Sequence, residues 1–485
     1  MKQEDLFSSL SSIKEISYKI RNGDLSPVDL VKTCFHRIKK MNPILNAFIT
    51  VIDEHAVYEQ ALICEREIKQ GNYRGPLHGI PFSIKDILYA KGVRCTAGSK
   101  ILANYIPKED STVVTKVKKA GAILMGTNNL NEFASGITGI NPFYGSSKNP
   151  WDITRISGGS SGGSAVAVAT GMVFFSLGTD TGGSTRVPAS LCGIVGLKPT
   201  YGFISKHNVF PLSPSLDHVG CITRNVWDAA AVLECVADIG ILDKTLGHNR
   251  TFKYTKIIEG KRCKKNVIGI PQKYFFDFIN PEVEHLFYNF IESISKYAII
   301  CQEKINLHNT AKYFKSWRNI RLAESSDVHS EWIKTRPMDY STEVRELLLE
   351  GNKISAVDYV KSMGLVKEIR GNFLSILRNE ADALIVPTTI IPAPRFEDDA
   401  IDVGDDDVVL TTREALLRNT IIFNSIGLPT VSIPVGLTNN RLPIGVQIVG
   451  APYNEDLVLS IAYDCEQQLN NTTNKPVPPI CMDKM

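Results

Sequence analysis

The most constraining feature of this chain is the segment Gly158 to Ser190, which reads GGSSGGSAVAVATGMVFFSLGTDTGGSTRVPAS. It carries two serine clusters flanked by glycine, GGSSGGS and TGGST, with an apolar stretch between them. Glycine allows backbone conformations closed to other residues and lets N–H groups approach a ligand closely. A serine in this setting is held at a tight turn beside amide donors. Acyl transfer at an amide or ester carbonyl requires such a hydroxyl and such donors, so the segment predicts a nucleophilic serine site.

Three other interpretations of the first cluster are weaker. A flexible linker is disfavoured, because an apolar run and a second Gly-flanked serine follow at once. A phosphate-binding loop is disfavoured, because the Gly-Lys-Ser/Thr ending is absent. Residues 158–162 match the G-x-S-x-G pattern of a nucleophile elbow, but 149–152 do not read as the strand that must precede it. The last histidine, His329, also lies too early for the base of that motif.

Without a histidine, another group must accept the serine proton, and Ser-Lys variants use a neutral lysine. Free lysine has a pKa near ~10.4, so the site must lower it by burial. Lys85 is the candidate, because it directly follows the apolar run Ile80–Ile84. On composition alone, a surface charge remains the commoner interpretation of any single lysine.

The apolar periodicity predicts helices that alternate with strands. Residues 5–70 are predicted to be helical, with Ser26 and Pro27 beginning one helix. The other predicted elements are a strand at 80–84, a helix and strand within 111–126, a buried helix at 164–175 with a strand to Leu177, helix–strand pairs at 281–301 and 354–387, strands at 430–435 and 444–449, and a helix at 454–468. This order predicts an α/β fold, a single large domain with a mixed central β-sheet covered by helices on both faces.

The charge balance of 54 basic against 51 acidic residues gives no reason to expect a nucleic-acid or membrane partner. The ten cysteines show no metal-site spacing, and several lie in apolar runs, so a reducing compartment is expected. With a polar N-terminus and no long apolar run, the protein is predicted to be cytoplasmic. No cofactor or metal is expected. The acidic stretch 391–409, with Glu397, Asp398, Asp399 and 405–407, is interpreted as a solvated loop.

The chain resembles the amidase signature family over nearly its whole length, with the weakest match from about 240 to 410. The motifs that carry the resemblance are GPLHGIPFSIKDI (75–87), GTNNLNEFASG (126–136), NPWDITRISGGSSGGSAVAVATG (149–171), GTDTGGSTRVPASLCGIVGLKPTYG (178–202), SLDHVG (215–220), GLPTVSIPVG (427–436) and LPIGVQIVG (442–450). The expected single domain (1–485) divides into an N-terminal helical segment (1–74), a catalytic core (75–230), a variable substrate-side region (240–410), a C-terminal part of the core (411–468) and a flexible tail (469–485).

The resemblance implies a catalytic triad of Lys85, Ser160 and Ser184. Ser184 would be the nucleophile, and Ser160, preceded by a cis peptide bond, would bridge it to Lys85. The backbone N–H groups of Thr181, Gly182, Gly183 and Ser184 would form the oxyanion hole. Asp180 and Arg186 are expected to orient this loop through hydrogen bonds.

The resemblance leaves three activities open. The first is a stand-alone amidase that hydrolyses a carboxamide. The second is the glutaminase (A) subunit of an aspartyl/glutamyl-tRNA amidotransferase, which requires a partner subunit. Such subunits usually carry an aspartate where this chain has Leu417 and a serine- and glutamate-bearing stretch where it has Gly139 to Phe143; Arg370 is a loosely aligned candidate for meeting the glutamine carboxylate. The amidase is therefore preferred. The third, a non-catalytic scaffold, is disfavoured by the intact triad.

Substrate-binding residues are not identified by any motif. The pocket is expected to be lined by the 240–410 region and by the loop near 130–145. Its candidate apolar walls are Phe143, Tyr144, Phe210 and Trp317, each of which could equally be plain core. The expected partner is a small-molecule amide. The sequence does not give the oligomeric state, and a homodimer is one option, because dimers are the commonest assembly.

Overall fold

The computed structural model describes residues 11–238, 252–260, 265–271, 273–296, 298–301, 312–402, 409–472 and 476–481. Its α-helices are α1 (Ile13–Asn22), α2 (Pro27–Leu45), α3 (Glu54–Lys69), α4 (Thr112–Lys119), α5 (Gly162–Ala169), α6 (Arg186–Cys192), α7 (Val226–Val236), α8 (Tyr254–Glu259), α9 (Pro281–Ile294), α10 (Tyr313–Val328), α11 (Ser330–Thr335), α12 (Thr342–Gly351), α13 (Ala356–Asn379), α14 (Thr412–Leu417), α15 (Ile421–Ser425) and α16 (Glu455–Thr472). Its strands are β1 (Phe48–Val51), β2 (Pro81–Lys85), β3 (Ile123–Asn128), β4 (Phe175–Asp180), β5 (Val195–Lys198), β6 (His218–Thr223), β7 (Val267–Gly269), β8 (Ile299–Cys301), β9 (Ala383–Pro387), β10 (Ala400–Asp402), β11 (Val409–Thr411), β12 (Thr430–Leu437) and β13 (Pro443–Val449).

The described strands form one large sheet and one small one. The large sheet has 11 strands in the order β1-β3-β2-β4-β6-β5-β12-β13-β9-β7-β8, and β10 pairs with β11 separately. Strand β2 runs parallel to β3 and β4, whereas β6, β5, β12 and β13 join antiparallel to their neighbours. The predicted single-domain α/β fold with a mixed central sheet is therefore confirmed.

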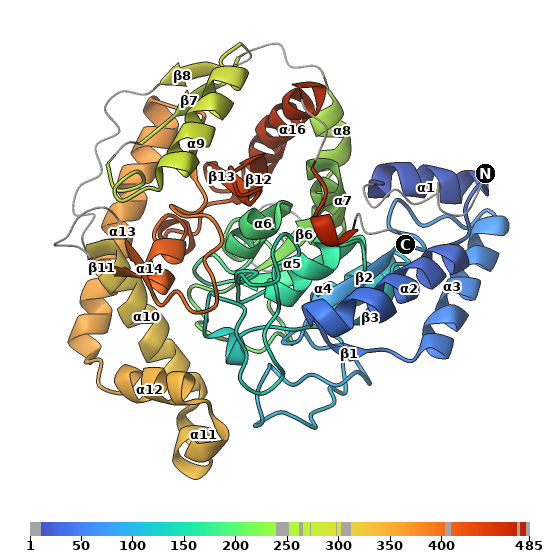
Figure 1. The fold of residues 1–485 in the computed structure, drawn as a ribbon, viewed down its shortest axis with the longest axis horizontal. Helices are drawn as coiled ribbons and strands as arrows, with labels where there is room; N and C mark the ends of the chain where they lie inside the picture. Colours follow the sequence, from blue (N-terminus) through green and yellow to red (C-terminus); the bar gives the residue numbers. More distant parts are fainter. Residues whose placement is uncertain are drawn as a thin grey trace.

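Helices cover both faces of this sheet (Figure 1). Neighbouring residues of β6 point to opposite faces. Gly220 faces the side of α6, because a Cβ there would lie 3.2 Å from Thr185 Oγ1, just before that helix. Its neighbour Cys221 faces the side of α7, where its Sγ contacts the Ala229 carbonyl oxygen at 3.8 Å. The α6 face of the sheet is built of small residues. At Gly196 of β5, for example, a Cβ would lie 2.7 Å from the Cβ of Ala189, so glycine lets α6 approach closely.

The N-terminal segment differs from the all-helical expectation for 5–70. Helices α1, α2 and α3 are present, but Phe48–Val51 forms β1, an edge strand that pairs antiparallel with β3. Helix α1 begins with a capping box of Ser12 and Glu15, and α2 begins with the predicted pair Ser26 and Pro27. Residues 5–10 of this prediction lie outside the described residues.

The helix predicted at 164–175 is shorter than expected. Helix α5 ends at Ala169, and the chain then turns at Gly171, whose φ of +67° is a left-handed conformation that stops the helix. Strand β4 begins only at Phe175 and runs to Asp180, three residues beyond the predicted end at Leu177. This extension carries the strand to the first residues of the second serine cluster.

The region from 312 to 402 builds a second hydrophobic cluster beside the main core. Helices α10 and α13 pack together there, and side chains from β9, α14 and α15 complete the cluster. Figure 1 shows α10, α12 and α11 extending away from the sheet. The acidic stretch 391–409 is described up to Asp402, where Glu397 and Asp399 are exposed; residues 405–407 lie outside the described residues.

The segment 469–485, expected to be a flexible tail, is partly regular in its described residues. Helix α16 continues to Thr472, and a 3₁₀ turn spans Pro479–Cys481. Ile480 and Cys481 pack against the main core, so apolar contacts hold this part of the segment. No helix within the described residues is long and apolar enough to cross a membrane.

Candidate active site

Lys85 is the last residue of β2 and is fully buried. Because β2 and β4 are parallel neighbours, both strands end at the same edge of the sheet. The Nζ of Lys85 donates hydrogen bonds to Ser160 Oγ at 2.7 Å and to Thr179 Oγ1 at 2.8 Å. Within the described part of the chain, no carboxylate forms an ion pair with this amine. Burial lowers the pKa of Lys85 to about 7, although the more distant charges of Asp180 and Asp217 oppose this shift.

Ser160 lies in the turn that enters α5, and its side chain is fully buried. The Gly159–Ser160 peptide bond is cis, and Gly158 has a left-handed φ of +74°. The next residue joins the two serine clusters, because the N–H of Ser161 donates to the Ser184 carbonyl oxygen at 3.2 Å. The Ser161 hydroxyl also donates to the carbonyl oxygen of Thr179 at 3.2 Å. The two Gly-flanked segments are thus packed side by side, as the acyl-transfer interpretation requires.

Ser184 lies between β4 and α6 and is 5% exposed. The structure brings it next to Ser160 through the Ser161–Ser184 backbone contact. The Ser184 hydroxyl forms no hydrogen bond with Ser160, with Lys85 or with any other described residue. Lys85 and Ser160 of the predicted triad are therefore joined directly, and Ser184 lies beside them without a hydrogen bond from its hydroxyl to the described residues.

The backbone N–H groups from Thr181 to Ser184 differ in their availability. The N–H of Gly183, expected in the oxyanion hole, instead donates to Asp180 Oδ1 at 2.8 Å. The φ of Gly183 is +135°, which turns this peptide toward the buried carboxylate. The N–H groups of Thr181, Gly182 and Ser184 make no hydrogen bond with the described residues, so three of the four expected donors are available to a ligand.

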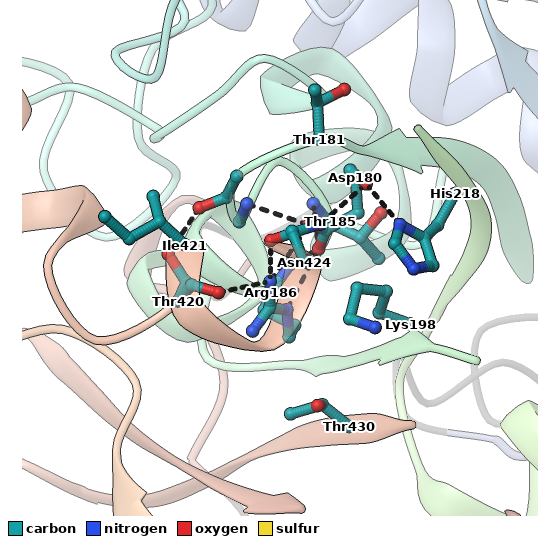
Figure 2. Close-up of polar contacts among 12 residues, drawn as sticks. Asp180, Thr181, Thr185, Arg186, Lys198, His218, Thr420, Ile421, Asn424 and Thr430 are labelled. Carbon is teal, nitrogen blue, oxygen red and sulfur yellow. Dashed lines mark hydrogen bonds and ion pairs between the residues drawn. The ribbon is translucent and has the colours of Figure 1, made fainter. Parts of the chain in front are cut away.

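Asp180 and Arg186 form a fully buried ion pair at the base of this turn (Figure 2). The carboxylate accepts hydrogen bonds from the N–H groups of Gly183 and Thr185 and from the Arg186 guanidinium. Burial alone would raise the pKa of Asp180, but the charge and hydrogen bonds of Arg186 hold it well below its usual range. The pair therefore stays ionised and holds the turn that carries Ser184.

The C-terminal part of the core completes the environment of Arg186. Its guanidinium donates to Gln447 Oε1 at 2.8 Å, to Asn424 Oδ1 at 2.6 Å and to the Thr420 carbonyl oxygen at 3.2 Å. Sequence analysis did not identify these three residues, which follow Arg186 by more than 230 positions. Thr179, the second partner of Lys85, was also missed, although it lies within the quoted motif 178–202.

Trp317 is the candidate wall residue that contacts the turn carrying Ser184. Its Nε1 donates to the Thr181 carbonyl oxygen at 3.0 Å, and a Cβ at Gly182 would lie 2.6 Å from its Cζ2. Leu417 is buried on the same side, 3.4 Å from that Cβ position. Phe210 instead belongs to an aromatic cluster with Phe133, His329 and Trp332, and it also lines a cavity of about 270 Å³ that reaches Thr179.

The remaining sequence candidates lie in other surroundings. Phe143 stacks under the Nζ of Lys100, 4.8 Å from the ring centroid, and the Tyr144 hydroxyl contacts the Ser99 carbonyl oxygen at 3.5 Å. Arg370 donates through Nη1 to the carbonyl oxygen of Ile426. In the described ranges, no group of three or more His, Cys, Asp or Glu side chains is placed to hold a metal ion.

Comparison with known proteins gives concordant matches over most of the chain. The family model described as Amidase matches residues 29–459. The A subunit of the glutamyl-tRNA(Gln) amidotransferase of Heliobacterium modesticaldum is 35% identical over 467 residues, which are 92% of this chain and 94% of that protein. A crystal structure of an amidase superposes with a TM-score of 0.85 at 32% identity, covering 94% of this chain and 100% of the other. A structure from a protein complex that bears on the origins of an s-triazine catabolic enzyme gives a TM-score of 0.87 at 29% identity, covering 95% and 98%.

Proposed function

The chain belongs to the amidase signature family, and we propose that it hydrolyses a carboxamide to a carboxylate and ammonia or an amine. The proposal assigns Ser184 as the nucleophile, Ser160 as the proton bridge and Lys85 as the base. The observation that carries it is the buried Lys85 amine, whose pKa is lowered to about 7 and whose Nζ lies 2.7 Å from Ser160 Oγ. A lysine near neutrality is able to accept a proton at physiological pH.

The first half of the reaction forms an acyl-enzyme. Neutral Lys85 takes the proton of Ser160 as Ser160 takes that of Ser184, after the Ser184 hydroxyl has rotated toward Ser160. The Oγ of Ser184 then forms a bond to the amide carbonyl carbon, and the available N–H groups of Thr181, Gly182 and Ser184 stabilise the oxyanion. When the C–N bond breaks, the proton on Lys85 returns through Ser160 to the leaving nitrogen.

The second half repeats this chemistry with water. Water attacks the acyl carbon as its proton passes to the Lys85–Ser160 relay, and the bond from Ser184 Oγ to the acyl carbon breaks. The relay returns a proton to Ser184, and the carboxylic acid product ionises. The net reaction consumes one amide and one water, and it releases one carboxylate and one ammonium or amine.

A second candidate is the glutaminase component of an aminoacyl-tRNA amidotransferase, which works with a partner subunit. It is favoured by the 35% identical relative that bears this description. The surroundings of the turn favour the amidase instead. The position of the usual aspartate is Leu417, an apolar side chain packed near Gly182, and Arg370 already donates to the Ile426 carbonyl. A buried leucine offers nothing to the ammonium group of free glutamine.

Ammonia release by the purified protein alone tests the proposal. The panel contains short aliphatic amides, aryl amides and glutamine, and Ser184→Ala is the matched control because it removes one oxygen from the turn. We expect turnover of one or more simple amides that Ser184→Ala abolishes while its melting temperature stays unchanged. Turnover of glutamine alone, and only in the presence of tRNA and a partner subunit, would instead support the second candidate. If Ser184→Ala turned over amides as fast as the unsubstituted protein, the assignment of Ser184 as the nucleophile would be refuted.

The proposed setting is cytoplasmic, and the proposed assembly is a homodimer. The first rests on buried thiols such as Cys34, Cys192 and Cys221, which occupy apolar surroundings as reduced side chains. The second rests only on the general frequency of dimers. Sedimentation of the purified protein measures the assembly directly.

A further inference from the structure

Arg321 is a buried arginine whose guanidinium is only partly satisfied. It lies on α10, is 2% exposed, and donates through Nη1 to Ser135 Oγ at 3.1 Å. Its Nε is buried without a hydrogen-bond partner among the described residues, and the guanidinium makes its hydrogen bond to them through Nη1 and not through Nη2. Nε and Nη2 are the two donors of one edge of the guanidinium, the edge that binds a carboxylate through two parallel hydrogen bonds.

The two carboxylates that act on Arg321 are paired with other arginines. Glu343 and Glu350 are the nearby carboxylates, but Glu343 pairs with Arg413 at 3.2 Å and Glu350 pairs with Arg318. Of Arg318, Arg321 and Arg413, Arg321 is therefore the one that forms no ion pair with a described residue. Burial and the charges of Arg413 and Arg318 lower the pKa of Arg321 well below its usual range. Since an arginine remains protonated in proteins, this environment would be stabilised by one additional anion.

Arg321 also lies close to the catalytic turn. It follows Trp317 by one helical turn, and its Cζ is 5.6 Å from the centroid of the Trp317 ring. Trp317 in turn contacts Thr181 and Gly182, whose N–H groups belong to the proposed oxyanion hole. On its other side, the partner of Arg321 is Ser135, in the segment that packs against the first serine cluster.

The contact of that segment with the serine cluster is direct. Gly139 N–H donates to Asn131 Oδ1 at 2.9 Å, and this oxygen would lie only 2.3 Å from a Cβ at Gly159. The guanidinium of Arg321 therefore lies between α10 and a segment that touches the residue before Ser160. Arg321 is thus linked to the turn of Ser184 through Trp317 and to the segment beside Ser160 through Ser135.

We propose that Arg321 binds a carboxylate at the far end of the acyl chain, so that the substrate is a monoamide of a dicarboxylic acid. This inference rests on the proposed hydrolysis at Ser184. The unpaired Nε–Nη2 edge of Arg321 would receive the two carboxylate oxygens, and the Ser135 hydroxyl would hold the opposite side of the guanidinium. Neutral amides of the same length would leave the charge of Arg321 uncompensated.

The activity test compares each anionic monoamide with its neutral diamide. Succinamate, glutaramate and adipamate are paired with succinamide, glutaramide and adipamide, so that the acyl chain lengthens by one methylene from pair to pair. We expect the protein to prefer the monoamide of the best length, and Arg321→Gln to lower the ratio of the two kcat/KM values by roughly 10- to 100-fold, the range for a hydrogen bond to a charged group. Lys315→Gln, which removes an exposed cation from the same helix, should leave this ratio unchanged.

The binding test does not require turnover. Calorimetric titration of Ser184→Ala with the same six compounds should show binding of a monoamide that is lost in Ser184→Ala/Arg321→Gln and partly kept in Ser184→Ala/Arg321→Lys. If Arg321→Gln does not fold, the role of Arg321 is tested in two other ways. One is the binding by the Arg321→Lys variant, and the other is the preference of the protein with Arg321 intact for monoamides over diamides. Binding of monoamides without hydrolysis of any amide would support the subsite and refute the proposed function. Equal binding of monoamides and diamides, or a ratio that Arg321→Gln leaves unchanged, would overturn the role of Arg321.

Discussion

Two buried cations, Lys85 and Arg186, lie near the turn that carries Ser184, and their partners differ in kind. Arg186 is paired with Asp180 and with polar groups from the C-terminal part of the core. Lys85 is equally buried, but the partners of its Nζ are two hydroxyls, those of Ser160 and Thr179. An ion pair keeps a cation charged and rigid, whereas burial against neutral partners favours the uncharged amine. Arg186 and Lys85 therefore differ in their partners and not in their depth of burial.

The sharpest test of this comparison is Lys85→Met. It removes the proposed base, and we expect turnover to fall by about 10⁴-fold or more, as for the loss of a member of a catalytic triad. Stability should change far less, because the substitution leaves no charge unpaired and Met fills a similar volume. Ammonia release and the melting temperature are measured on the same preparation. A variant that retains turnover would refute the base assignment.

The opposite outcome is expected for Asp180→Asn. This change leaves the Arg186 charge buried without a carboxylate, which we expect to cost about 3–5 kcal/mol in the free energy of unfolding. Asp152→Asn is the matched control, since Asp152 pairs with Arg155 at 3.1 Å on a partly exposed surface and its loss should cost under about 1 kcal/mol. Chemical denaturation measures both. Equal stability of the two variants would contradict the structural role of the buried pair.

The pH dependence of turnover sharpens the contrast further. The pKa of Lys85 is lowered to about 7, and the base must be neutral to act. Below this value the amine is protonated, so kcat/KM for a neutral amide should rise about tenfold per pH unit and level off above about 7. The measurement is a pH–rate profile on a substrate that does not itself ionise between about pH 5 and 9. A rate that still climbs up to about pH 10 would indicate an ordinary, solvated lysine.

The smallest expected effect concerns the second hydroxyl partner of Lys85. Thr179 Oγ1 accepts a hydrogen bond from Nζ at 2.8 Å, and the ammonium form donates more strongly than the amine. Thr179→Val should therefore lower the apparent pKa of the pH–rate profile by less than about one unit, and Thr179→Ser, which keeps the hydroxyl, should not. An upward shift in Thr179→Val would show that this hydroxyl does not favour the charged form.

Much of the fold was predictable from local sequence. The strands β2, β3, β9, β12 and β13 are short apolar runs bounded by glycine, proline or polar residues, and each was predicted near its observed position. Strand β1 was not, because its four residues FITV lie between two amphipathic helices and are held by pairing with β3 about 75 positions later. The sequence of these four residues alone does not indicate a pairing with a distant strand.

The residues of the candidate site also fall into those that the local sequence identifies and those that it does not. Ser160 and Ser184 were identified because glycine-rich motifs surround them, and Lys85 was identified because it follows the apolar run Ile80–Ile84. The structure places Lys85 and Ser160 in contact. Asn424 and Gln447 were not identified, because their role depends on contact with Arg186, which precedes them by more than 230 positions. The use of the Gly183 N–H by Asp180 was also not predictable, since it depends on the orientation of a single peptide.

The hydrogen bond from Trp317 to the Thr181 carbonyl joins the segment with the weakest family resemblance to the turn with the strongest. A lineage that remodels α10 to accept a different acyl group also displaces the indole that steadies this turn. A change of substrate selectivity would then also change the turnover rate. Evolution toward new amides would require compensating substitutions near Trp317 and near Thr181.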